Sequence, residues 1–289
     1  MTAGFDDKAD SAAIHLIVNA DDYGYYPCVS RGIAAAARAG AISATGVLAN
    51  SPSLDSQIPS LGECPNLDIG VHLNLTSRLP LTPAMAAKLP DGQFPSVFAM
   101  AGRIMVGSID VATVYGEWRA QIEAVLHYGL PLRFLNSHEH IHMLPRLFPV
   151  ALALAKEYGM AQVRETRPEW LPPWGFSAVL RNGLLSAMAV ANHPQSQADA
   201  PVFIGLAGSG KLRLEYLQNL FARLKPGTTY ELMCHPGLFD SAEINDTRLL
   251  AYHDWESELA LLTSPSLREL YAAHGIALLN YRGLPVNPS

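Results

Sequence analysis

Short apolar runs alternate with amphipathic segments along most of the chain. Residues 14–18 form a continuous, β-branched run, which is typical of a strand buried on both faces. Helix-forming residues follow at 29–38, and Gly40 stands where a helix would end. The same alternation predicts strands at 42–48, 67–75, 133–136, 161–164, 202–206, 228–234 and 276–280, and helices at 53–61, 111–128, 147–158, 176–191, 212–224 and within 246–273.

Repeated strand–helix units joined by short turns predict a parallel sheet. About seven to eight such units favour a closed or nearly closed, TIM-like (β/α) barrel over an open doubly wound sheet. Proline-rich residues 78–109 interrupt the pattern with broken helices, and the sequence leaves open whether they form a lid. We therefore expect one α/β domain over residues 13–289, preceded by a disordered polar tail at residues 1–12.

Composition narrows the classes of protein to consider. Of the 289 residues, 49% are hydrophobic and 16% charged, which argues for a large core and against disorder. A net charge of −6 without a basic stripe argues against a nucleic acid or an anionic membrane as partner. The cysteines Cys28, Cys64 and Cys234 show no CxxC spacing, as in a reducing compartment. No segment is typical of a signal peptide or a membrane span, so we expect a cytoplasmic protein without membrane insertion.

Two polar sites end predicted strands in the first third of the chain. Asp21 and Asp22 close the strand at 14–18, and neighbouring strand residues point to opposite faces. One carboxylate can therefore bind a cation while the other stays free as a base, although an Asx turn or a helix N-cap would also explain one of them. His72 lies near the end of the strand at 67–75, where a lone histidine is more often a core residue.

The strongest local signal is Ser-His-Glu-His-Ile-His at residues 137–142, directly after a predicted strand. If this segment is extended, His138, His140 and His142 share one face, and imidazoles suit Zn²⁺, Ni²⁺ or Fe²⁺. The pattern is not HExxH and no helix is expected here, which excludes a zincin site. A cluster of surface histidines is the alternative.

Further candidates lie at later strand ends. His235 follows the strand at 228–234 and is a candidate general acid, while Cys234 beside it points into the packing. Arg164 ends the strand at 161–164 and is a candidate for contact with a substrate hydroxyl or carboxylate. Trp170 and Trp174 could stack on sugar rings, or could instead cover the barrel or form a dimer contact. The remaining histidines have no supporting context: His15, His127, His193, His253 and His274.

Together these segments resemble the YdjC-like family of carbohydrate deacetylases, which includes chitooligosaccharide deacetylases and a hopanoid-associated branch. The matching segments occur in family order and span most of the chain, at residues 16–24, 70–72, 137–142 and 231–236. Tyr23 stands where phenylalanine is common, and Glu139 stands where chitooligosaccharide-type members often have histidine. The resemblance implies a distorted (β/α) barrel and an N-acetylated carbohydrate as substrate.

The resemblance also implies one divalent metal ion, Mg²⁺ or Zn²⁺, held by Asp22, His72 and His138. Asp21 would be the general base and His235 the acid near the leaving amine, while His140 and His142 would support the site or contact substrate. The reaction would remove an N-acetyl group by attack of a metal-bound water.

General chemistry agrees with this scheme, because a metal lowers the pKa of water and stabilises the developing oxyanion. Asp21 would take the proton of the water, and a histidine can supply one to the amine. The metal would keep Asp22 ionised, which would leave Asp21 as the freer carboxylate.

Two rival functions and several details stay open. A metal-dependent phosphoesterase would usually need more ligands than the three identified. A non-catalytic carbohydrate-binding protein on a hydrolase scaffold is the second rival. The acyl group could sit on a chito-oligosaccharide, a lipid-linked glycan or another amine. A homodimer is the expected assembly.

Overall fold

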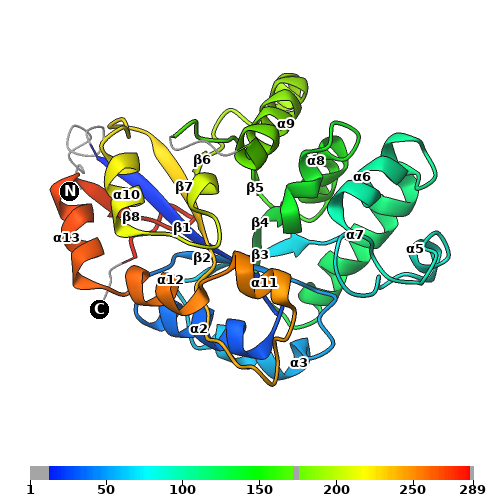
Figure 1. Ribbon diagram of the computed structural model, residues 1–289, viewed down its shortest axis with the longest axis horizontal. Coiled ribbons are helices and arrows are strands. Elements are labelled where there is room, and N and C mark those ends of the chain that lie inside the picture. Colours follow the sequence, from blue (N-terminus) through cyan, green and yellow to red (C-terminus); the bar gives the residue numbers. More distant parts are fainter. Residues whose placement is uncertain (1–12, 172–175, 287–289) are drawn as a thin grey trace, which may run out of the picture.

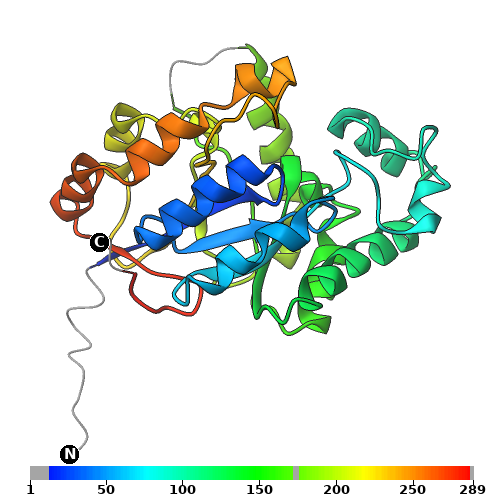
Figure 2. The ribbon, with the colours of Figure 1, turned by 90° about the horizontal axis from the view of Figure 1, so that it is seen from below.

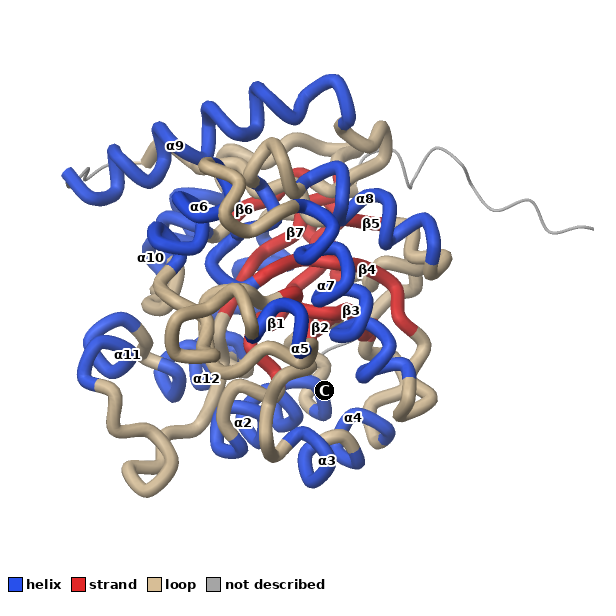
Figure 3. The backbone as a smooth tube through the Cα atoms, turned by 90° about the vertical axis from the view of Figure 1, so that its right-hand side faces the viewer, coloured by secondary structure: helices blue, strands red, loops and turns tan. Residues whose placement is uncertain are grey.

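The computed structural model describes residues 13–171 and 176–286, so the predicted tail at residues 1–12 and Trp174 lie outside the described part. An eight-stranded sheet forms its centre, and helices surround the sheet (Figures 1 and 3). The strands are β1 (Ile14–Tyr23), β2 (Ala44–Val47), β3 (Asp68–Leu73), β4 (Leu132–Ser137), β5 (Gln162–Val163), β6 (Val202–Ile204), β7 (Thr229–Cys234) and β8 (Ile276–Leu278).

All strand pairs in this sheet are parallel, in the order β5-β4-β3-β2-β1-β7-β6. Strand β1 is central: β7 pairs with it on one side, while β8 pairs with its first residues and β2 with its last. No described ladder joins β5 to β6, so the curled sheet is a barrel left open between these two strands. The predicted distorted, TIM-like α/β barrel is confirmed.

Helices cover the outside of the curled sheet. Helix α2 packs on β1, α7 on β3, and α8 on β4 and β5; Figure 2 shows α2, drawn in blue, running alongside β1. The helices are α2 (Pro27–Arg38), α3 (Leu54–Gln57), α4 (Pro59–Gly62), α5 (Pro83–Ala86), α6 (Val97–Met105), α7 (Val111–Leu126), α8 (Phe148–Glu157), α9 (Phe176–Asn192), α10 (Leu214–Phe221), α11 (Thr247–Tyr252), α12 (Trp255–Leu262) and α13 (Pro265–Ala273). Short 3₁₀ helices are η1 (His138–Met143), η2 (His193–Gln195) and η3 (Leu206–Gly208).

The alternation of side chains along β1 separates two cores. Leu16, Val18 and Ala20 belong to the large cluster between sheet and helices. Ile17 belongs to a small second cluster with Ala44 and Phe134, which lies on the opposite face. That opposite face is the interior of the barrel, and Asn19 and Asp21 continue it towards the carboxyl end of β1.

Most predicted elements are present, with shifted ends. The helix predicted at 53–61 is divided into α3 and α4, because Pro59 begins a new helix. Residues 246–273 fold into α11, α12 and α13. The broken helices predicted within 78–109 are α5 and α6, at the right-hand edge of Figure 1. No helix in the described part of the chain is long and apolar enough to cross a membrane.

Helix α2 approaches the loop after β7 so closely that one position admits only glycine. A methyl group added at Gly32 would lie 2.3 Å from the backbone of Gly237. The backbone N–H of Leu238 also donates to the carbonyl of Cys28 at 3.2 Å. The loop that begins with His235 therefore rests directly on the backbone of α2.

We expect Gly32→Ala to destabilise the protein by roughly 1–3 kcal/mol, because overpacking of a filled contact costs about this much. Thermal unfolding is the measurement. Gly116→Ala on α7 is the matched control, since no atom beyond the neighbouring residues and the backbone of its own helix lies within 4 Å of the added Cβ. Alanine is the better helix former, so this control should gain about 0.5–1 kcal/mol. Equal effects of the two substitutions would contradict the close approach at Gly32.

Candidate metal centre and active site

The predicted site residues gather beyond the carboxyl ends of the strands. Asp21 and Asp22 lie near the end of β1 and His72 near the end of β3, while His138 follows β4 and His235 follows β7. In parallel α/β sheets this edge carries the binding and catalytic groups, because the connections that leave it are free to vary. Strand ends far apart in the sequence therefore build one site.

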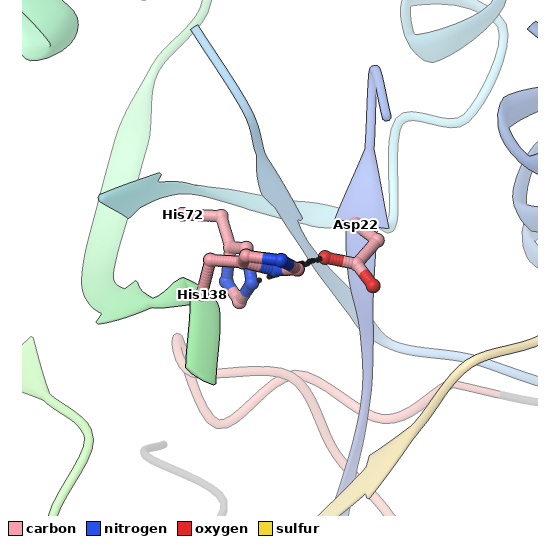
Figure 4. A group of neighbouring side chains, drawn as sticks. All are labelled: Asp22, His72 and His138. Atoms are coloured by element: carbon pink, nitrogen blue, oxygen red, sulfur yellow. Dashed lines mark hydrogen bonds and ion pairs between the residues drawn. The ribbon is translucent and has the colours of Figure 1, made fainter. Parts of the chain in front are cut away.

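Asp22, His72 and His138 point toward one another (Figure 4). Oδ1 of Asp22 lies 3.2 Å from Nε2 of His72 and 3.0 Å from Nδ1 of His138. One ligand atom from each residue lies within 4.8 Å of the others. A carboxylate and two imidazoles at this spacing form a candidate site for a divalent metal ion.

The amide of Asn136 fixes the orientation of His72. Nδ1 of His72 lies 2.8 Å from Oδ1 of Asn136, while Nδ2 of Asn136 donates to Oδ1 of Asp21 at 2.9 Å. His72 therefore donates its Nδ1 proton to Asn136, and the lone pair of Nε2 faces the carboxylate of Asp22. Two acceptors at this distance repel each other unless a cation or a proton lies between them, so the arrangement fits a metal ligand.

The backbone adopts left-handed conformations on both sides of the candidate metal site. The φ angles are 71° at Asp22, 52° at Glu139 and 56° at His140. Such conformations cost of order 1–3 kcal/mol each and cluster at functional sites. The expectation that no helix forms at 137–142 is wrong, because the 3₁₀ helix η1 follows Ser137 at once, so the segment lacks the extended form in which the three histidines would share one face.

His140 and His142 have different surroundings. Nδ1 of His140 lies 3.1 Å from the hydroxyl of Thr166. His142 is fully buried, accepts from the hydroxyl of Ser137 at 2.6 Å and donates from Nε2 to the carbonyl of Arg164 at 2.8 Å. Burial lowers the pKa of His142 to about 4 and holds the pKa of His140 well below its ordinary range. His142 thus stabilises the turn formed by η1 through its two hydrogen bonds, whereas His140 lines the cavity over the candidate metal site.

Arg164 holds Asp21 in a buried, two-pronged ion pair. Its Nη1 lies 2.5 Å from Oδ2 of Asp21 and its Nη2 lies 2.8 Å from Oδ1. Its Nε donates to Oε1 of Glu231 at 2.6 Å, and its side chain is 0% exposed. The expectation that Asp21 is the freer carboxylate is therefore wrong. The side-chain hydrogen bonds of Arg164 are with Asp21 and Glu231, and its contact with a substrate stays a prediction.

The charges around the site favour a bound cation. Burial raises the pKa of Asp21, but the charge of Arg164 outweighs it and lowers the pKa to about 2. Burial opposes ionisation of Asp22 as well, yet His138 holds its pKa well below the ordinary value. Asp21, Asp22 and Glu231 are all buried here, and the guanidinium of Arg164 pairs with only two of them, Asp21 and Glu231. A divalent cation at Asp22 would offset the excess negative charge.

His235 is held through its backbone. It is 7% exposed, and its N–H donates to Oε2 of Glu258 at 2.7 Å. The other oxygen of Glu258 accepts from the N–H of Leu212 at 3.2 Å. The thiol of Cys234 is fully buried, donates to the carbonyl of Asn19 at 3.5 Å and has its pKa raised well above the ordinary value by burial. Cys234 is thus part of the packing and is not an activated thiol.

A cavity of about 620 Å³ opens over the candidate metal site. Asp21, Asp22, His72, His138 and His235 line its inner end. Its outer walls are largely apolar and come mainly from α6 and α9, with Val97, Phe98, Ala101, Leu180, Leu184, Leu185 and Met188. Trp170 is not among the lining residues and is 46% exposed, so the cavity does not support the predicted stacking on a sugar.

Three residues with a part in this site were not identified from the sequence. Glu231 had a usable signal, because a carboxylate inside an apolar strand must find a buried partner. Asn136 also ends a strand, but nothing in the sequence pairs it with His72. His253 follows α11, and its ring centroid lies 5.0 Å from that of His235. No spacing in the sequence predicts that contact.

Comparison with known proteins gives a consistent result. The family model described as YdjC-like protein matches residues 15–273. A carbohydrate deacetylase of Geobacillus stearothermophilus is 29% identical over 270 residues, which cover 93% of this chain and 97% of that protein. A carbohydrate deacetylase of Enterococcus faecalis (strain ATCC 700802 / V583) is 30% identical over 276 residues, with coverage of 93% and 97%.

A solved structure shares the fold. The crystal structure of a protein from Enterococcus faecalis V583, provisionally named as a cellobiose-phosphate cleavage protein, superposes with a TM-score of 0.71 at 26% identity. The match covers 95% of this chain and 100% of the solved chain. The whole curled barrel is therefore common to both proteins.

The geometry predicts which substitutions impair metal binding. Asp22→Asn should abolish one-to-one binding of Zn²⁺, because it removes the negative ligand. Asn136→Ala should weaken binding by about 10–100-fold, the usual effect of losing the partner of a ligating histidine. Asp21→Asn should retain stoichiometric metal. Titration calorimetry on chelator-treated protein measures all three, and loss of metal in Asp21→Asn would contradict the separate roles of the two aspartates.

The ion pair of Asp21 predicts a large stability effect. Arg164→Met should cost about 3–5 kcal/mol, because it leaves two buried carboxyl groups without their cation. Arg164→Lys should destabilise the protein less than Arg164→Met, since lysine keeps the positive charge but cannot form the two parallel hydrogen bonds of the guanidinium. Urea unfolding measures both changes, and a near-neutral Arg164→Met would contradict the role of the ion pair.

The same ion pair predicts a pH dependence. The pKa of Asp21 is depressed from 3.8 to about 2, so its stabilising contribution is present above about pH 4 and is lost as the pH falls through 2. Urea unfolding at a series of pH values between about 5 and 2 should show this decline in metal-free wild type and less of it in Asp21→Asn. Parallel curves for the two proteins would contradict the assignment.

Proposed function

The chain belongs to the YdjC-like protein family, and on that premise we propose that it is a metal-dependent carbohydrate N-deacetylase. One observation carries the proposal: Asp22, His72 and His138 converge at the inner end of a cavity that Asp21 and His235 also line. The names of the relatives support a carbohydrate as substrate and deacetylation as the reaction.

We assign the metal to Asp22, His72 and His138. A divalent cation bound there would supply a Lewis acid for the acyl oxygen and would acidify a water. One carboxylate and two imidazoles favour a transition metal such as Zn²⁺ over Mg²⁺. The Nδ1 contact of His72 with Asn136 keeps Nε2 free for this role.

Asp21 serves as the general base. It is ionised at neutral pH, and Arg164 and Asn136 hold both its oxygens in fixed positions. A carboxylate with so low a pKa is a weak base, so it accepts the proton of the attacking water only as the new bond to the acyl carbon forms. Arg164 therefore tunes the base as well as orienting it.

His235 serves as the general acid. Water adds to the acyl carbon, the C–N bond breaks, and the nitrogen leaves as an amine only if it gains a proton. His235 follows β7, the strand that pairs with β1, and it lines the same end of the cavity as Asp21. Proton removal and proton delivery are thus assigned to separate residues, and acetate and the free amino sugar are the products.

Two rival functions have weaker support. Within the described residues, the only group of three or more candidate ligands is Asp22, His72 and His138, and a two-metal phosphoesterase would need a second set. A retired scaffold that only binds sugar would have no need for a base held by Arg164 or for an intact ligand set.

The outer cavity supports a substrate with an apolar substituent. Phe98 is 73% exposed, Leu180 61% and Leu184 46%, and all three line the cavity. The residues of α6 and α9 that line the cavity are apolar apart from Arg181, and they offer few groups that could donate a hydrogen bond to a sugar. Covering such surface stabilises a complex by about 25 cal/mol per Å². We therefore favour an N-acetyl amino sugar that carries an apolar group over a long chito-oligosaccharide.

Acetate release tests the proposed function. Zinc-loaded protein should release acetate from an N-acetylglucosamine derivative, and Asp21→Asn should reduce kcat by at least about 100-fold while retaining metal, since general-base catalysis contributes this much. His235→Asn should also reduce kcat without loss of metal. A panel of mono-, di- and longer chito-oligosaccharides, octyl N-acetylglucosaminide and a sugar nucleotide defines the substrate. Acetate release that persists in Asp21→Asn would contradict the role of Asp21 as general base. Absence of acetate release from every member of the panel would contradict the proposed deacetylase function.

A further inference from the structure

Two imidazoles form one polar patch in the wall of the cavity. His253 and His235 both line the cavity, and their ring centroids lie 5.0 Å apart at an interplanar angle of 61°. His253 follows α11, while His235 follows β7, so the two come from separate parts of the fold. The proposed mechanism uses His235 as an acid but leaves His253 without a role.

Aromatic neighbours hold the ring of His253 in place. It stacks on Trp255 with centroids 4.8 Å apart and planes at 13°, and it makes a T-shaped contact with Tyr252 at 4.8 Å and 80°. The backbone N–H of His253 donates to the carbonyl of Leu249 at 2.8 Å. Contacts with two aromatic rings therefore fix the orientation of the His253 ring, without any side-chain hydrogen bond to its nitrogens in the described residues.

Both rings carry a buried nitrogen without a hydrogen-bond partner. Nδ1 of His235 and Nδ1 of His253 are sealed from solvent and unpaired within the described part of the chain. A buried N–H without an acceptor is costlier than an unpaired lone pair, so a neutral His253 ring carries its proton on Nε2. Because Nδ1 is enclosed, the edge of each ring that meets the cavity is the one that carries Nε2.

The charge of His253 limits what it can bind. Burial, with a smaller contribution from His235, lowers the pKa of His253 to about 3, so the ring is neutral near pH 7. A neutral N–H donor matches a hydroxyl, ether or carbonyl oxygen and gives no charge attraction for a phosphate. The Nε2 edge of His253 therefore suits a neutral sugar oxygen.

We propose that Nε2 of His253 donates a hydrogen bond to an oxygen of a neutral sugar, next to the position whose nitrogen meets His235. His253 is then a specificity-determining residue that sets the sugar in register with the acid. The part of this inference that concerns the leaving nitrogen rests on the proposed function. The recognition of a neutral sugar oxygen does not, and binding alone tests it.

The test is sugar binding by zinc-loaded protein that carries Asp21→Asn, so that no turnover occurs. The ligand is methyl N-acetyl-β-glucosaminide, and calorimetry gives Kd. Three substitutions distinguish the contributions of the two ring nitrogens to binding. His253→Gln places an amide nitrogen near the position of Nε2, and His253→Asn places one near the position of Nδ1. His253→Phe keeps only a stacked ring. Loss of one neutral hydrogen bond should raise Kd about 3–10-fold in the Asn and Phe variants, while the Gln variant keeps an affinity close to that of the parent.

His127→Phe is the matched control, because His127 is exposed beyond the end of α7 and does not line the cavity. It should leave Kd unchanged, and thermal unfolding should show that all variants fold. Equal Kd values in the three His253 variants and the parent would overturn the inference. So would an equal loss in all three, which would indicate packing alone, or a parent that does not bind this sugar.

Acetate release by the same substitutions in the protein with intact Asp21 separates the two proposals. If sugar binding follows the predicted order and no acetate is released, the inference stands and the proposed deacetylation fails. If acetate is released but the Kd values of the His253 variants do not follow the predicted order, the inference about His253 fails and the proposed function stands. If both hold, the Asn and Phe variants should raise KM by the same factor as Kd and leave kcat within about threefold of the parent, the pattern of lost uniform binding.

Discussion

The guanidinium of Arg164 is the contact on which the mouth of the barrel depends. Arg164 follows β5, at one end of the sheet, and it pairs with Asp21 on central β1 and Glu231 on β7. Its guanidinium also lies 5.3 Å from the ring centroid of Phe203, on β6 at the other end of the sheet. No backbone ladder joins β5 to β6 among the described strands, so this side chain connects the open edges where hydrogen-bonded strands do not. A buried cation with two carboxylate partners is well suited to this role, because removing either partner leaves a charge unpaired.

The same contact orders the chemistry of the site. Arg164 takes both oxygens of Asp21, and Asn136 reaches one of them while its own oxygen receives the proton of His72. The candidate base and a candidate metal ligand are therefore positioned by one connected network. Because these groups are buried, their electrostatic interactions are stronger than in water. A displacement of one side chain in the network therefore also displaces its hydrogen-bonded partners. We therefore expect a small shift of β5 relative to β1 to affect both the proposed metal binding and the proposed proton transfer.

Short-range pattern was enough to predict the strands and to place the candidate metal-binding residues at strand ends, whereas the choice of Asp22, His72 and His138 came from the family resemblance. Apolar, β-branched runs such as residues 14–18 identify buried strands, and parallel strands bring their carboxyl ends to one edge, where Asp22, His72 and His138 meet. Prediction failed where the outcome depends on distant partners or on unusual backbone angles. Period-two alternation at 137–142 gave the wrong faces because Glu139 has a positive φ. The contact of His253 with His235 depends on how α11 docks, which no local pattern records.

The adjacent aspartates show how one backbone angle can divide two identical side chains between two roles. Ile17, Asn19 and Asp21 share the interior face of β1, which brings Asp21 to Arg164 and Asn136. A regular strand would send Asp22 to the outer face, among the helices. Its φ of 71° instead turns the carboxylate toward His72 and His138. The cost of that conformation is tolerable for aspartate, whose short polar side chain visits the left-handed region more readily than most. A metal ion bound at Asp22 would stabilise this turned conformation, so metal binding and the local backbone geometry should reinforce each other.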